Sequence, residues 1–126
     1  WMRTRGMKTG IDIVEIQRID LLINTHGDKF LNKVFTASEQ NYCDTAANAS
    51  EKYAGRFAAK EAIRKALQPF TNATYLPFLD IEILPDKFGL PQVTIDTSIS
   101  FRQPFSDISI SISHERQYAI ANAIVQ

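Results

Sequence analysis

The residues best suited to chemistry lie in three separate segments: Asp12, then Glu61 with Lys65, then His114. Asp12 interrupts a short run of β-branched residues, where an aspartate is locally unfavourable. Glu61 and Lys65 lie four residues apart in an alanine-rich segment, so in a helix they share one face. His114 stands where a predicted strand meets a turn. Local misfits of this kind are expected where function overrides structural preference.

Two carboxylates from separate elements can hold one Mg²⁺ ion, because this ion takes few protein ligands and completes its octahedron with water and phosphate oxygens. Lys65 would face the same phosphates, with Arg56 and Lys60 adding positive charge nearby. His114 could bond a phosphate oxygen or move a proton. This set favours phosphoryl-group chemistry, in which positioning and charge neutralisation do most of the work. The structural alternative is an ordinary i,i+4 ion pair between Glu61 and Lys65.

The composition limits the classes of function. The chain has 126 residues, enough for one core but not two. Its 14 basic residues balance 14 acidic ones, which argues against a general nucleic-acid binder. The single Cys43 cannot form an internal disulfide, and there is neither a signal peptide nor an apolar run long enough to span a membrane. We therefore expect a soluble cytoplasmic protein that uses no membrane.

The element that must position these side chains is a helix over residues 53–67, which is rich in Ala, Lys, Arg and Glu and lacks proline. A strand is expected at 10–15, followed by a helix from about 15 to 25 that Gly27 ends. Thr36 and Glu39 have capping-box spacing, which predicts a helix through Tyr42 and gives Glu39 a structural role.

The second half of the chain predicts two β-hairpins. Residues 79–84 alternate, with Asp80 and Glu82 on the solvent face, and 92–95 return after a turn. Residues 108–113 and 118–125 form the closing hairpin, and 98–105 are either a short helix or a loop. The predicted fold class is α+β, with a mostly antiparallel sheet packed on the long central helix. Residues 1–9 are assigned to an N-terminal extension (a vector remnant or variant start), and 10–126 to one domain.

Nearly the whole chain from Gly10 onward carries motifs of one family, in the family's order. They are Gly10-Ile11-Asp12-Ile13-Val14-Glu15-Ile16 with Arg18-Ile19, Phe35-Thr36 with Glu39, Gly55-Arg56-Phe57-Ala58-Ala59-Lys60-Glu61-Ala62 with Lys65-Ala66-Leu67, Gly89 with Pro91, and Ser111-Ile112-Ser113-His114. On these segments the sequence resembles the holo-acyl-carrier-protein synthase family of 4′-phosphopantetheinyl transferases. The Arg-Phe-Ala-Ala-Lys-Glu-Ala string with an upstream Gly-Ile-Asp is highly specific.

The resemblance implies a homotrimer that binds coenzyme A in a cleft between subunits. It implies that Asp12 and Glu61 are the Mg²⁺ ligands, and that Lys65 and His114 act in catalysis and contact coenzyme A phosphates. The remaining implied site residues are Arg56, Gly89 and Pro91 at coenzyme A, Lys60 in a supporting electrostatic role there, and Arg18 at the acidic helix of the acyl carrier protein. Two segments depart from the family pattern: Gln68-Pro69-Phe70-Thr71 replaces a glycine-containing loop, and Leu90 replaces a basic residue.

The implied reaction is Mg²⁺-dependent transfer of 4′-phosphopantetheine from coenzyme A to a carrier-protein serine, with release of 3′,5′-ADP. Mg²⁺ would grip the pyrophosphate, and Mg²⁺ and Lys65 would stabilise the developing charge. The proton acceptor stays open among a metal-bound water, Glu61 and Glu115. The alternatives are a coenzyme A pyrophosphatase or phosphodiesterase and a catalytically silent module that binds a carrier protein or coenzyme A. Fatty acid biosynthesis is the expected setting, although polyketide and peptide carriers stay open.

Overall fold

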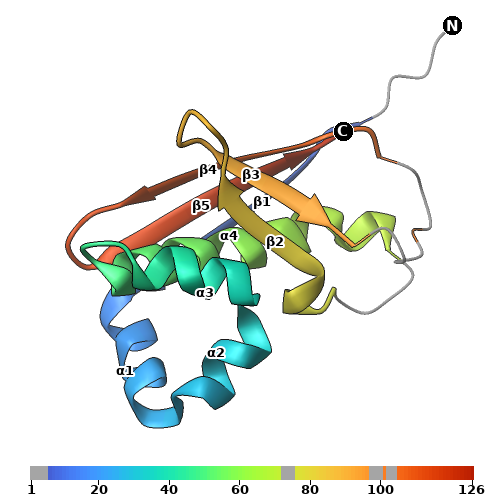
Figure 1. Cartoon of the computed structure of the whole chain (residues 1–126). Helices are drawn as coiled ribbons and strands as arrows, with labels where there is room; N and C mark the ends of the chain where they lie inside the picture. Colours follow the sequence, from blue (N-terminus) through green and yellow to red (C-terminus); the bar gives the residue numbers. More distant parts are fainter. Residues whose placement is uncertain (1–5, 72–75, 97–100, 102–104) are drawn as a thin grey trace, which may run out of the picture.

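A long helix packed on an antiparallel sheet forms the centre of the molecule, which confirms the predicted α+β class (Figure 1). The structure is a computed structural model that describes residues 6–71, 76–96, 101 and 105–126. The central helix, α4 (Ala49–Leu67), begins four residues before the predicted start because the Asn48 side chain caps it: Asn48 Oδ1 accepts from the Glu51 amide at 3.3 Å. The predicted segment 98–105 lies largely outside the described residues.

The three-stranded sheet has the order β1 (Lys8–Glu15), β5 (Tyr118–Val125), β4 (Ile108–His114), and each neighbouring pair is antiparallel. Asp12 lies opposite Ala121, which lies opposite Ile112 on its other side. β1 and β4 are therefore the two edges of this sheet. β1 begins at Lys8, which pairs with Val125, so the last residues assigned to an N-terminal extension belong to the sheet.

The other hairpin, β2 (Ile81–Pro85) and β3 (Pro91–Ile95), forms a separate two-stranded sheet in the described chain. The described strands therefore form two sheets, and both are antiparallel. Ile81 and Ile83 hold the hairpin from the helix side, because both side chains are buried in the core. The strand also starts two residues later than expected, at Ile81, because Phe78–Asp80 is a 3₁₀ turn; Asp80 is therefore not on a strand face.

Three helices precede α4: α1 (Ile16–His26), α2 (Asp28–Val34) and α3 (Ala37–Asp44). Gly27 ends α1 as predicted, at a φ of 52° that favours glycine. α2 starts immediately afterwards and was not predicted, because seven residues give too short a periodic signal. The capping box before α3 is confirmed: Thr36 Oγ1 accepts from the Glu39 amide, and Glu39 Oε1 accepts from the Thr36 amide.

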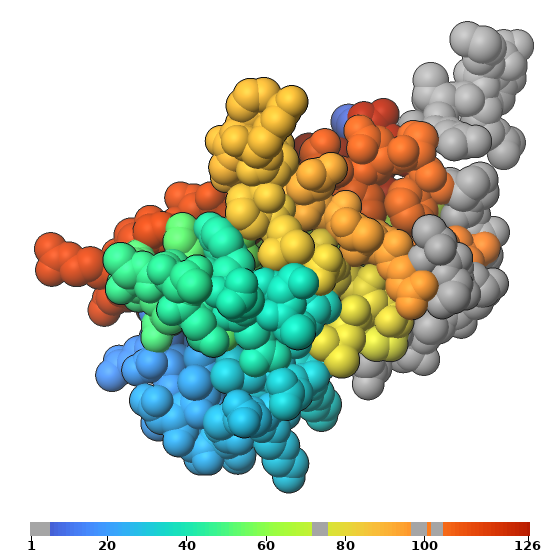
Figure 2. Space-filling model, in the orientation of Figure 1, coloured from blue at the N-terminus to red at the C-terminus, as the bar shows by residue number. Residues whose placement is uncertain are grey.

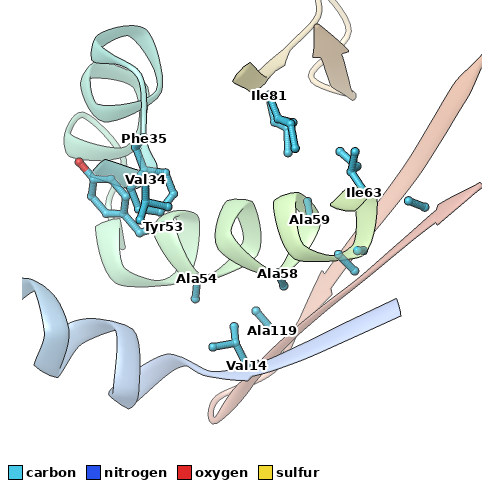
Figure 3. Close-up of a cluster of buried hydrophobic side chains, with 14 of the residues drawn as sticks. Val14, Val34, Phe35, Tyr53, Ala54, Ala58, Ala59, Ile63, Ile81 and Ala119 are labelled. Atoms are coloured by element: carbon cyan, nitrogen blue, oxygen red, sulfur yellow. The ribbon is translucent and has the colours of Figure 1, made fainter. Parts of the chain in front are cut away.

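Small residues allow α4 to lie directly on the sheet. Ala54, Ala58 and Ala62 are fully buried. Ala119 of β5 lies beside Ala58 (Figure 3). Gly10 makes the closest approach: a Cβ atom there would lie 2.0 Å from the Ala62 carbonyl oxygen. Any side chain at this position would push β1 away from the helix. The crossing matters because Asp12 follows two residues later on the same face of β1.

The two hairpin tips stand out from the body of the molecule, as the space-filling view shows (Figure 2). One is the β2–β3 turn, which contains Gly89 at a φ of 82°. The other is the β4–β5 turn, which begins directly after His114. Within the described ranges, no helix combines the length and apolar character that a membrane crossing requires.

Candidate functional site

The crossing of β1 and α4 brings Asp12 and Lys65 into contact. Lys65 Nζ donates to the Ile11 carbonyl oxygen at 2.9 Å and lies 3.2 Å from Asp12 Oδ1. Glu61 lies one turn before Lys65, and its Oε1 accepts from Arg64 at 2.5 Å. Each predicted metal-binding carboxylate is thus held by a cationic side chain of the same helix. The crossing brings Asp12 to Lys65, and Glu61 lies on the same helix one turn before Lys65.

The donor set at this crossing fits Mg²⁺ better than a cation that needs a full protein cage. Among the described residues there is no group of three or more His, Cys, Asp or Glu side chains able to hold a metal. Mg²⁺ commonly takes one or two carboxylates and fills its other positions with water and phosphate oxygens. Asp12 and Glu61 supply such a pair, and the side chains are partly accessible.

A second group of predicted site residues lines a cavity of about 180 Å³ between α4, the end of β4 and the β2–β3 turn. Its walls include Arg56, Gly89, Pro91 and His114. Arg56 is only 6% exposed, and its guanidinium carbon lies 4.3 Å from the centre of the Tyr42 ring. Its buried Nε has no hydrogen-bond partner among the described residues. A buried, incompletely bonded guanidinium in a cavity wall is suited to an anion.

The two groups lie at opposite edges of the three-stranded sheet. Asp12 and Lys65 are at β1, whereas His114 ends β4, and β5 separates these strands. Glu61 lies within about 40° of Lys65 around the helix, so it belongs with the β1 group. The predicted site residues therefore form two half-sites in one copy of the chain.

Lys60 requires a correction, because it belongs to neither half-site. Its side chain is fully buried, and Nζ donates to Val34 O at 2.7 Å, Glu39 Oε1 at 2.7 Å and Phe78 O at 3.1 Å. These acceptors use all three donors of an ammonium group, which leaves none for coenzyme A. Burial lowers the pKa of Lys60, and the Glu39 carboxylate opposes that shift.

Glu39 does more than the predicted helix cap. Its Oε1 accepts from Lys60, and its Oε2 accepts from the Ile83 amide at 2.7 Å. One buried carboxylate thereby joins α3, α4 and β2. The capping-box spacing accounted for Glu39 completely in the sequence, so no signal remained to indicate the buried pair.

The other predicted residues lie outside both half-sites. Arg18 is exposed on α1, near Leu21, which is also exposed. Glu115 closes the β4–β5 turn, where its Oε1 accepts from the amides of Gln117 and Tyr118. Sequence reasoning missed Glu51, whose Oε1 lies 2.8 Å from His114 Nδ1. Only the correct start of α4 could have placed Glu51 near the end of β4.

Comparisons with known proteins agree on one family. The sequence pattern of the 4′-phosphopantetheinyl transferase superfamily matches residues 8–123. Holo-[acyl-carrier-protein] synthase of Halothermothrix orenii is 44% identical over 115 residues, which are 89% of this chain and 90% of that protein. The synthase of Chlorobaculum parvum is 44% identical over 121 residues, 95% of this chain and 98% of that protein.

Solved structures give the same result. The crystal structure of Helicobacter pylori holo-[acyl-carrier-protein] synthase in complex with coenzyme A superposes with a TM-score of 0.77 at 33% identity, and the match covers 94% of this chain and 99% of that one. The chain belongs to the holo-acyl-carrier-protein synthase family of the 4′-phosphopantetheinyl transferase superfamily.

Proposed function

We propose that this protein transfers the 4′-phosphopantetheine group of coenzyme A to a serine hydroxyl of an apo acyl carrier protein and releases 3′,5′-ADP. The relatives named as holo-[acyl-carrier-protein] synthases support the reaction, and the Helicobacter pylori relative binds coenzyme A. The observation that carries the proposal in this chain is the Asp12–Lys65 contact beside Glu61. It combines carboxylates and an ammonium where a pyrophosphate would need both a metal and a cation.

Asp12 and Glu61 would hold Mg²⁺, which, when bound, neutralises phosphate charge and polarises the phosphorus that the serine attacks. The Lys65 ammonium stabilises negative charge on the same phosphates, and its bond to the Ile11 carbonyl fixes its position. In the transfer, a bond forms between the serine oxygen and the β-phosphorus, and the bond from that phosphorus to the oxygen of 3′,5′-ADP breaks. Glu115 serves the β4–β5 turn, which favours Glu61 as the protein carboxylate near the departing serine proton.

The second half-site would bind the remaining phosphate charge of coenzyme A. Arg56 offers a guanidinium fork in the cavity wall, and His114 lines the same cavity. Gly89 and Pro91 shape the opposite wall from the β2–β3 turn. These roles account for the predicted coenzyme contacts other than that of Lys60.

A cyclic homotrimer would unite the two half-sites. Because β1 and β4 are opposite sheet edges, a head-to-tail ring brings the β1 group of one copy to the β4 group of the next. The sheet face turned away from α4 also exposes apolar side chains, including Ile11 (59% exposed), Ile13 (61%) and Ile120 (37%). Contiguous exposed apolar residues are typical of subunit contacts.

The assembly can be tested by complementation. Glu61→Gln and His114→Ala disable different half-sites, so mixed assemblies should regain transfer that neither variant shows alone. A chain carrying both changes, treated identically, is the control. If mixed assemblies are present by native mass spectrometry and activity stays absent, the site is not shared between subunits.

Arg18 is the proposed contact for the acidic recognition helix of the carrier, since it lies exposed on α1. We assign the protein to the cytoplasm and to fatty acid biosynthesis, in keeping with its holo-[acyl-carrier-protein] synthase relatives and its free Cys43 thiol. Residues 10–126 are proposed as one functional domain.

Intact-mass analysis tests the reaction itself. An apo acyl carrier protein incubated with this protein, coenzyme A and Mg²⁺ should gain the mass of one phosphopantetheine. The gain should disappear with EDTA or with Glu61→Gln. Release of 3′,5′-ADP without modification of the carrier would identify a hydrolase instead, and no product with several carriers would leave a binding module.

A further inference from the structure

A close contact in the cavity at the β4 edge joins Glu51 of α4 to His114 of β4. Glu51 Oε1 lies 2.8 Å from His114 Nδ1, and the His114 side chain is 43% exposed. Both residues line the cavity that also contains Arg56. The histidine is thus held on one nitrogen while a large part of its ring stays accessible.

The packing of α4 on β4 sets this pair. At Gly55 an added Cβ would lie 3.0 Å from Ile112 Cγ2, so the helix and strand are close there. Glu51 lies one helical turn before Gly55, about 6 Å along the helix axis. His114 lies two residues after Ile112, about 6.6 Å along the strand. Because the helix and the strand run in opposite directions, these two displacements of similar length bring the Glu51 carboxylate to the His114 imidazole.

The position of Glu51 in the first turn of α4 would allow its carboxylate to accept from the Asn48 backbone amide instead of contacting His114. Glu51 follows the N-cap Asn48 by three residues, as Glu39 follows Thr36. Glu39 completes a capping box by accepting from the Thr36 amide. Glu51 makes no such bond to Asn48 among the described contacts; instead its carboxylate lies at His114.

We propose that Glu51 is a positioning residue that fixes the tautomer and orientation of His114. At 2.8 Å from a carboxylate oxygen, Nδ1 must carry a hydrogen, because two acceptors at that distance would repel. Nε2 is then the nitrogen left to contact the ligand. The proposal rests on the assigned role of His114 at a coenzyme A phosphate, and it names the group through which that histidine is aligned.

The most direct test is nitrogen-15 NMR of the imidazole rings at about pH 8, above the ordinary histidine pKa. The chain has two histidines, so His26 is an internal reference. Wild-type His114 should show the Nδ1–H tautomer. Glu51→Ala should move it towards the Nε2–H tautomer that free imidazole prefers. Glu51→Gln keeps an oxygen that accepts from Nδ1 and should retain the wild-type tautomer.

Calorimetry with coenzyme A alone, without a carrier, gives the second readout. Glu51→Ala and His114→Ala should each raise the Kd about tenfold, the size of a lost hydrogen bond to a charged group. The double variant should be no weaker than His114→Ala, because both changes act through one ring. Asp28→Asn, which also removes an acid from the first turn of a helix, should leave the Kd unchanged. Thermal unfolding confirms that each variant is folded.

An unchanged tautomer in Glu51→Ala would overturn the proposal. So would a Kd within twofold of wild type in either Glu51→Ala or His114→Ala, or additive losses in the double variant. Absence of carrier modification by the wild-type protein would instead refute the proposed function. The NMR and coenzyme-binding results would still decide the role of Glu51 in that case.

Discussion

Replacement of Lys60 by methionine should destabilise the protein severely. The side chain keeps its length and apolar stem but loses the ammonium, which leaves the Glu39 carboxylate buried without its counter-charge. Breaking a buried ion pair on one side typically costs about 3–5 kcal/mol. The carbonyl groups of Val34 and Phe78 also lose a donor. We expect a loss of about 4 kcal/mol, a large part of the roughly 5–15 kcal/mol that stabilises a typical domain.

Urea denaturation followed by circular dichroism measures this loss. Glu39→Gln tests the other side of the pair, and the double variant Lys60→Met/Glu39→Gln should be more stable than the sum of the single losses implies. Lys29→Met is the matched control, because Lys29 is exposed on α2 and should change stability by no more than about 0.5 kcal/mol. A loss below about 1 kcal/mol for Lys60→Met would refute the reasoning.

Three further outcomes are expected. Gly10→Ala should lower the free energy of unfolding, measured by urea denaturation, by more than about 1 kcal/mol, because the new Cβ meets the Ala62 carbonyl oxygen. Gly6→Ala is its control, because there is open space around Gly6. Arg18→Glu should raise the KM for the carrier protein about tenfold and leave that for coenzyme A unchanged, because Arg18 lies on α1 away from both half-sites; an equal rise for both substrates would remove Arg18 from the carrier surface. Cys43 should resist iodoacetamide at pH 9 until the protein unfolds, because burial raises the pKa of its thiol to about 12; rapid labelling of folded protein would contradict this.

The secondary structure was readable where local patterns are strong. The alternating strands, the capping box and the alanine-rich helix each have a period or a cap that depends only on near neighbours. The helix α2 and the break between the two sheets were not readable, because tertiary contacts decide them. Ile81 and Ile83, for example, fix the β2–β3 hairpin against helices that are distant in the sequence.

The site was predictable in part for the same reason. Asp12, Glu61 and Lys65 stood out as residues unsuited to, or unusually grouped in, their local elements, and the fold brings Asp12 to Lys65. Lys60 carried the same kind of signal but lies in the core, because neighbouring helix residues point about 100° apart. Glu51 gave no signal, since an acid in the first turn of a helix is ordinary.

The difference of about 100° between the directions of Lys60 and Glu61 has a consequence for the rotation of α4 about its own axis. Lys60 is anchored to acceptors from three other segments, on a side of the helix away from the alanines that pack on the sheet. The interior ammonium therefore fixes the rotation of α4 about its axis. It sets the angle at which the helix presents Glu61 and Lys65 to β1, so the accuracy of the surface chemistry depends on a charge that no substrate reaches.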